Sequence, residues 1–307
     1  GETIDVRSGD AVVGLDGATG AVVRFADAKV GRELAGGAQE LFRLLVVPPG
    51  AGPGQPLELS SRDARAVKRI EGDGVRLRFE RIGNWDLAAV CVVEAGTDGL
   101  FRFRIRVEGE SGAVVERVDY PLLALAAPLE GDGAGDALVL GTTKGGVLQR
   151  PHQWKPGRSA AGTQPGNLAA QFGCYYGSKG GVVTYCEDSV GHPKTLAAMR
   201  TADGMVLGWR HPMRNDLKEP LALAFPVAAG VFRAAGGAAA DWRDAAAIYK
   251  AYALKQPWCA RRLADRDDLP SWLKEGPAQV RFGREWLGQP ERIEAWLEKY
   301  WAKHVAG

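Results

Sequence analysis

The stretch that decides the fold is Gln164–Lys194, which reads QPGNLAAQFGCYYGSKGGVVTYCEDSVGHPK. Residues 168–176 are apolar and aromatic, and residues 182–187 alternate with β-branched and aromatic side chains, as strands do. The glycines between these two segments adopt positive φ at little cost, so the stretch predicts a β-hairpin. The loop 188–194 that follows contains an acid, an imidazole and an ammonium. We therefore expect a polar loop directly after a buried hairpin.

The same pattern of short predicted strands and glycine-containing turns extends from the N-terminus to about Phe232. Residues 100–107 alternate apolar and basic side chains, which predicts one face in the core and the arginines on a solvated sheet face. On the order of fifteen strands fit into about 230 residues, more than an immunoglobulin-sized sandwich contains. The pattern predicts a mainly β domain over residues 1–236, built as a large two-sheet antiparallel sandwich.

The pattern changes at Asp241, which is a plausible N-cap for an amphipathic helix that ends before Pro257. We interpret residues 237–273 as this helix and a charged linker. Residues 274–307 predict one strand (278–282) and one helix (291–304), a single β/α unit with nothing to pair against. We expect this unit to begin a second domain, a (β/α)8 barrel truncated here. The alternative is a C-terminal helix that packs back on the sandwich.

Composition and charge argue against several classes of function. The net charge is +2 with scattered basic residues, which argues against a nucleic-acid partner. No apolar run is long enough to span a membrane. The four histidines lack metal-ligand spacing, and there is no phosphate loop or dinucleotide fingerprint, so we expect neither a metal nor a cofactor. Cys174 and Cys186 lie on the two predicted hairpin strands, either bridged or, as the favoured alternative, as two buried thiols.

Two series of residues carry a resemblance to a known family. The first comprises Gln164-Pro165-Gly166, Gln171-Phe172, Tyr175-Tyr176, Gly180-Gly181, Glu187-Asp188 and Gly191-His192-Pro193-Lys194. The second comprises Asp241-Trp242-Arg243, Ala245-Ala246, Ile248-Tyr249-Lys250, Gln256-Pro257-Trp258 and Leu269-Pro270-Ser271-Trp272-Leu273. In the first series the chain resembles the N-terminal β domain of a poorly characterised, mostly bacterial group of glycoside-hydrolase-like proteins. In the second series it resembles the helix and linker that join this domain to a barrel in the same group.

The resemblance implies a galactose-mutarotase-like supersandwich ahead of a catalytic TIM barrel, with carbohydrate as the ligand. It implies a glycoside hydrolase for the full-length protein, extracellular or periplasmic, although the chain begins GETIDV without a signal peptide. The catalytic carboxylates of such enzymes lie at the C-terminal ends of barrel strands. No catalytic residue is therefore assigned, and the chain is expected to be inactive alone. Its predicted partners are carbohydrate and, intramolecularly, the barrel.

The polar loop provides the first candidate contacts for a sugar. Asp188, His192 and Lys194 have the groups to hydrogen-bond sugar hydroxyls, or to project towards a barrel active site. The alternative is a structural loop in which Asp188 binds local backbone groups. Glu187 and Asp188 are adjacent and are predicted to point to opposite faces, so they do not form a catalytic carboxylate pair.

Aromatic residues provide the second set of candidates. Trp154 and Trp209 are candidates to stack on pyranose rings, although core packing is favoured for any single aromatic residue. His211 is a candidate second polar contact. Two other functions stay open, a stand-alone carbohydrate-binding module and a purely structural domain. The least favoured is a mutarotase or epimerase that uses His192 with Glu187.

Overall fold

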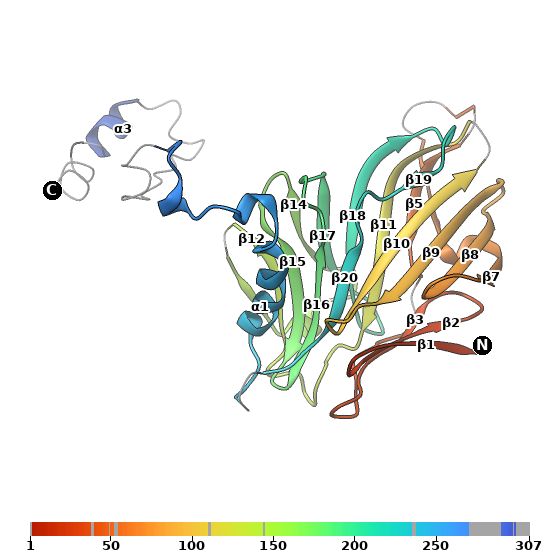
Figure 1. Ribbon diagram of the computed structural model, residues 1–307, viewed down its shortest axis with the longest axis horizontal. Coiled ribbons are helices and arrows are strands. Elements are labelled where there is room, and N and C mark those ends of the chain that lie inside the picture. Colours follow the sequence, from red (N-terminus) through yellow and green to blue (C-terminus); the bar gives the residue numbers. More distant parts are fainter. Residues whose placement is uncertain are drawn as a thin grey trace. The chain divides into compact units, whose positions relative to one another are not determined.

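The computed structural model describes residues 2–37, 40–48, 50–51, 55–109, 112–143, 145–234, 238–269, 290–296 and 298. The chain divides into two compact units, Gly1–Gln256 and Pro257–Gly307. The first unit is mainly β and is drawn from red to cyan in Figure 1, with one blue helix. Its described strands form three antiparallel sheets. The prediction of a mainly β, antiparallel sandwich is confirmed.

The sheets have four, ten and six strands. The four-stranded sheet has the order β1 (Thr3–Ser8), β2 (Ala11–Asp16), β3 (Val22–Asp27), β4 (Arg32–Glu33). The ten-stranded sheet has the order β13 (Val147–Gln149), β12 (Ala137–Thr142), β15 (Leu168–Gly177), β16 (Gly180–Cys186), β20 (Val227–Phe232), β10 (Leu100–Gly109), β9 (Leu87–Ala95), β8 (Val75–Ile82), β7 (Ala64–Ile70), with β19 (Leu221–Ala222) also paired to β10. The six-stranded sheet has the order β14 (Ser159–Gln164), β17 (Lys194–Arg200), β18 (Met205–Asn215), β11 (Val114–Leu125), β5 (Arg43–Val47), β6 (Leu57–Ser60).

The number of sheets differs from the two predicted, because the N-terminal strands β1 to β4 pair with one another instead of extending a large sheet. Their apolar side chains still join the main core. Phe25 of β3 is fully buried, and its ring lies 6.1 Å from that of Phe101 on β10 in an edge-to-face contact. The four-stranded sheet is therefore a small additional layer, which packs on the sandwich through the shared core.

The main core lies between the two large sheets. Phe103 of β10 meets Tyr120 of β11 with ring centroids 6.2 Å apart, so aromatic rings from the two sheets are in direct contact. Alternation along β10 has the predicted outcome, since Phe101 and Phe103 are fully buried while Arg102 is half-buried and Arg104 and Arg106 are exposed. Each fully buried aromatic or branched side chain stabilises the fold by about 1.5–3 kcal/mol relative to an exposed one.

The predicted hairpin is confirmed as β15 and β16. The chain turns tightly after Gly177, and Gly180 has a φ of +121°, which a residue with a side chain rarely adopts. The hairpin register also answers the question of the disulfide. Cys174 packs in the outer apolar cluster and Cys186 in the main core, on opposite faces of the sheet, and both thiols are free.

The predicted helix forms as α1 (Trp242–Ala253) and packs on the outer face of the ten-stranded sheet, beside β15 and β16 (Figure 1). Asp241 is the N-cap, as predicted, and Asp244 completes a capping box. The ring of Tyr249 stacks on Phe172 of β15 at 5.3 Å, and the ring of Tyr185 on β16 lies 5.6 Å from Tyr249. These contacts hold α1 on the sheet.

In the second unit the described elements are two 3-10 turns, η4 (Pro257–Cys259) and η5 (Leu263–Asp265), and the helix α3 (Pro290–Trp296). The predicted strand 278–282 lies outside the described residues, as does half of the predicted helix 291–304, of which residues 291–296 and 298 are described. Two further 3-10 turns, in the first unit, are η1 (Ser61–Asp63) and η2 (Pro151–Gln153). Among the described residues, no helix has the length and apolar character needed to cross a membrane.

Two of the predicted site residues, Trp209 and His211, lie on β18 and point into the main core. Trp209 is fully buried and donates a hydrogen bond from its indole nitrogen to the Thr184 hydroxyl at 3.1 Å. His211 is 1% exposed, and its Nε2 donates to the Tyr120 carbonyl oxygen at 3.2 Å. Burial lowers the pKa of His211 to about 4, because the charged imidazolium is poorly solvated there.

The buried imidazole predicts an acid-sensitive fold. As the pH falls below the ordinary histidine pKa of about 6.5, the unfolded chain binds a proton that the folded chain does not bind until about pH 4. The free energy of unfolding should therefore fall by roughly 3 kcal/mol between these pH values because of His211. Urea denaturation of His211→Gln at pH 7 and pH 4.5 should show a smaller loss than the unsubstituted chain.

The matched control is Val30→Ala, since Val30 is 56% exposed and carries no titratable group. This variant should lose stability with falling pH much as the unsubstituted chain does. Equal losses for His211→Gln and the unsubstituted chain would contradict the assignment of acid sensitivity to His211.

Candidate functional site

The chain places two adjacent acids, Glu187 and Asp188, directly after β16. They point to opposite sides of the ten-stranded sheet, as predicted from the alternation of a strand. Glu187 accepts hydrogen bonds from Arg102 on the outer face. Asp188 faces inward and accepts from the buried ammonium of Lys194. The end of β16 therefore contributes to two polar sites with different surroundings.

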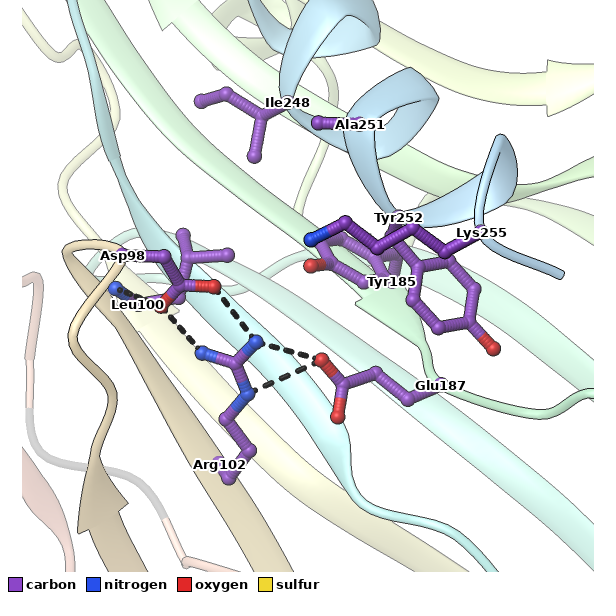
Figure 2. A pocket seen from close by; sticks show the side chains of 9 residues that line it. All are labelled: Asp98, Leu100, Arg102, Tyr185, Glu187, Ile248, Ala251, Tyr252 and Lys255. Atoms are coloured by element: carbon purple, nitrogen blue, oxygen red, sulfur yellow. Dashed lines mark hydrogen bonds and ion pairs between the residues drawn. The ribbon is translucent and has the colours of Figure 1, made fainter.

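The outer site is a cavity of about 430 Å³ between α1 and the ten-stranded sheet, called here the α1 pocket. It is lined by Asp98, Leu100, Arg102, Tyr185, Glu187, Ile248, Ala251, Tyr252 and Lys255. Figure 2 shows the helix side chains on one side of the pocket and Arg102, held between two acids, on the other. All nine residues belong to the first compact unit.

The pocket exists because β20, the strand between β10 and β16, has small side chains on the face that α1 covers. Arg102 of β10 and Tyr185 of β16 both pair with Ala228 of β20, so the three residues form one row across the sheet. In the next row, Gly230 of β20 lies between Leu100 and Val183. Small side chains in the middle of each row leave space that larger ones would fill.

Arg102 is the centre of the polar wall. Its guanidinium donates to both carboxylate oxygens of Asp98, at 2.5 and 2.7 Å, and to Oε1 of Glu187, at 2.6 and 3.1 Å. The turn before β10 positions Asp98, whose Oδ1 also accepts from the backbone N–H of Leu100 at 3.2 Å. Bidentate pairing of this kind fixes geometry as well as charge.

This wall is suited to binding and not to proton transfer. The hydrogen bonds from Arg102 lower the pKa of Asp98 below its ordinary value. Burial opposes the charge of Arg102, but the two carboxylates raise the pKa of its guanidinium further. A glycosidase acid needs a carboxyl group whose pKa is raised. Asp98 is in the opposite situation, so we assign it no acid–base role.

Sequence reasoning did not find the α1 pocket. It placed Arg102 on a solvated sheet face with the other arginines of that strand, because alternation alone does not show what covers a face. The signal that points to the pocket is the run of small residues 228–230, since a strand with so little side-chain volume leaves space beside its neighbours. Recognising this signal requires the strand order β16-β20-β10, which joins segments far apart in the sequence.

The inner site contains four of the predicted contact residues and is called here the Asp188 cluster: Asp188, His192, Lys194, His211 and Phe225. Asp188 accepts from the backbone N–H groups of residues 190, 191 and 192 at 3.0, 3.1 and 2.6 Å. It also accepts from Lys194 Nζ at 2.5 Å and lies 2.9 Å from His192 Nδ1. This is the structural role considered for the loop, with the carboxylate binding local backbone groups.

Phe225 joins the cationic and imidazole groups of the Asp188 cluster. Lys194 Nζ lies 5.1 Å from the Phe225 ring centroid, and the rings of His192 and His211 lie 5.5 and 5.6 Å from it. Lys194 is fully buried and Asp188 is 2% exposed. Burial alone would raise the pKa of Asp188, but the bonds from Lys194, His192 and the backbone hold it below its ordinary value. The Asp188–Lys194 ion pair is therefore enclosed, while His192 lies at the exposed edge of the cluster.

The remaining candidates lie apart from both sites. Trp154 is partly buried against the main core, and the guanidinium of Arg158 lies 4.9 Å above its ring. Trp209 is inside the core, where no ligand reaches its ring. His192 bonds Asp188, while Glu187 bonds Arg102, so the pair considered for a mutarotase has two separate sets of partners. Across the described ranges, no group of three histidine, cysteine or acidic residues is arranged to hold a metal ion.

We expect a large loss of stability when only one partner of the buried Asp188–Lys194 ion pair is removed. Lys194→Met leaves a buried carboxylate without its cation and should lower the free energy of unfolding by about 3–5 kcal/mol. The double variant Asp188→Asn/Lys194→Met removes both charges, while the Asn oxygen still accepts from the backbone. It should therefore be more stable than Lys194→Met alone, as measured by urea denaturation.

Lys179→Met is the control for this experiment, because Lys179 is exposed in the turn of the same hairpin. It should change the free energy of unfolding by no more than about 0.5 kcal/mol. If Lys194→Met is as mild as Lys179→Met, the ion pair is not a major source of stability.

Comparison with known proteins finds solved structures that are similar to this chain in fold. No model of a known protein family matches the chain, and no curated protein matches it. The α-N-acetylgalactosaminidase NagBb from Bifidobacterium bifidum, in complex with GalNAc, matches 97% of this chain with a TM-score of 0.64 and 15% identity. A quadruple mutant of NagBb matches 97% with a TM-score of 0.62 and 14% identity. Both matches cover 50% of NagBb, so this chain spans about half the length of that enzyme.

A third solved structure is similar in fold over most of the chain. The galactose mutarotase related enzyme from Lactobacillus acidophilus matches 78% of this chain and 100% of its own, with a TM-score of 0.52 and 8% identity. At these identities the likeness concerns the fold. The chain therefore has the antiparallel, mainly β fold of galactose mutarotase-like domains, the fold that the two series of residues implied.

Proposed function

We propose that this chain is the non-catalytic β portion of a carbohydrate-active enzyme, a glycoside hydrolase that acts on O-glycosidic bonds. The observation that carries the proposal is the likeness in fold to NagBb, which extends over 97% of this chain and half of that enzyme. A match of this extent includes residues beyond the β unit. It supports the interpretation of residues 274–307 as the start of a (β/α)8 barrel.

The three carboxylates of the two polar sites support the proposed non-catalytic role. Asp98 and Glu187, which line the α1 pocket, are both bound to Arg102. Asp188 is enclosed and paired with Lys194. None of these three carboxyl groups is available as the acid of a glycosidase, which must protonate a leaving oxygen. In the proposed enzyme the catalytic carboxylates belong to the barrel, and the β portion contributes carbohydrate binding or support.

The proposal predicts that this chain alone does not hydrolyse glycosides. Release of p-nitrophenol from p-nitrophenyl α-D-galactopyranoside and from the corresponding α-N-acetylgalactosaminide should stay at the uncatalysed rate. The product of the complete reading frame should hydrolyse at least one α-glycoside of such a panel. Its sequence should contain six or seven further β/α repeats after residue 307.

Two results would contradict the proposal. One is hydrolysis by the chain alone that is abolished by Asp98→Asn or Glu187→Gln. The other is a complete reading frame that lacks a barrel and cleaves no glycoside, which would favour a stand-alone binding module or a structural domain.

A further inference from the structure

We infer that the α1 pocket is a binding site for one uncharged pyranose ring of a carbohydrate. The inference deepens the proposed function and rests on it only for the ligand class, carbohydrate. The size of the pocket, its mixed walls and its balanced charge support the assignment.

The size of the pocket fits a single sugar ring. Its volume of about 430 Å³ lies at the lower end of the range of small-molecule sites, roughly 300–1,000 Å³. The pocket is open on one side, where the exposed side chains of Ala251 and Lys255 form its edge. One ring can therefore enter while the rest of a glycan stays in solvent.

The walls offer the two kinds of contact that a pyranose needs. Tyr185 and Tyr252 lie with ring centroids 5.3 Å apart, and together with Leu100 and Ile248 they provide an apolar and aromatic side. The C–H face of a sugar ring packs on such surfaces, as apolar groups do on aromatic faces. Across the pocket, the Asp98–Arg102–Glu187 wall provides hydrogen-bond donors and acceptors (Figure 2).

The polar wall keeps hydrogen-bonding capacity for a ligand. Every bond that joins Glu187 to Arg102 uses Oε1, which leaves Oε2 as an acceptor for a sugar hydroxyl. Lys255 contributes three N–H donors at the other side of the opening. A carboxylate and an ammonium that both bind hydroxyl groups suit a polyol, since each hydroxyl can donate and accept.

The charges of the pocket select an uncharged ligand. Asp98 and Glu187 carry two negative charges, and Arg102 and Lys255 carry two positive charges, so the lining is balanced. An anionic sugar would be close to two carboxylates, and a cationic sugar close to a guanidinium and an ammonium. A charged sugar would lose hydration on entering this partly buried site, and the balanced lining returns no net attraction, so we expect discrimination against both.

Binding to this chain can be measured by isothermal titration with methyl α-D-galactopyranoside, its 2-acetamido-2-deoxy analogue and methyl α-D-glucopyranoside. We expect at least one of these neutral probes to bind with a Kd in the millimolar range or tighter. Galacturonate and galactosamine should bind at least about fivefold more weakly. Tyr252→Ala should weaken the best neutral probe about tenfold, because the aromatic side of the pocket is lost.

One further variant and two controls test the pocket without removing the ion pairs of Arg102. Ala251→Trp places a large ring at the exposed edge of the pocket and should abolish binding while leaving the fold intact. Arg104→Gln and Lys250→Ala are the matched controls, because they lie on β10 and α1 beside pocket residues but do not line the cavity. Both controls should bind as the unsubstituted chain does.

The inference is overturned if none of the neutral probes binds, if a charged probe binds best, or if Ala251→Trp binds as well as the controls. These results leave the proposed function intact, because a glycosidase reading frame does not depend on this pocket. Conversely, binding in the pocket together with a reading frame that cleaves no glycoside would retain this inference and reject the proposed function.

Discussion

The structure depends on one constraint, the alternation of side chains at the end of β16. Because successive residues point to opposite faces, Glu187 lies on the outer side of the ten-stranded sheet and Asp188 faces inward. A shift of one residue in register would exchange them. The shift would bury Glu187, the partner of Arg102, in the core and would expose Asp188, the partner of Lys194. The same hairpin therefore supports a solvent-facing pocket and a closed ion pair.

The ion pair explains why the register is held. A buried ammonium is costly unless it is paired and hydrogen-bonded, and Lys194 has its carboxylate in direct contact. Asp188 in turn receives three backbone N–H groups of its own loop. The Gln171 side chain donates to the Asp188 carbonyl at 3.1 Å, which ties the loop to β15. We infer that the Asp188 cluster acts as structural support and that recognition takes place on the other face.

Much of the fold can be predicted from local patterns. The hairpin after residue 164, the helix capped by Asp241 and the alternation of residues 100–107 all follow from periodicity and turn chemistry. The separate N-terminal sheet does not follow, because pairing among β1 to β4 is a choice between partners that local pattern leaves open. The α1 pocket does not follow either. It needs Arg102, Ala228 and Tyr185 in one row, and the three lie on strands brought together by non-local pairing. Trp209 is likewise buried in the core, and the residue type alone does not reveal this.

The central claim is that the outer face of the ten-stranded sheet, beneath α1, is where this protein meets carbohydrate. The most direct measurement is a crystal structure of the chain soaked with the neutral methyl pyranoside that binds best. The account predicts electron density for one ring in the α1 pocket, with a hydroxyl within hydrogen-bonding distance of Glu187 and one face on Tyr252. Density for the sugar at the Asp188 cluster or on the six-stranded sheet, with the α1 pocket empty, would contradict it.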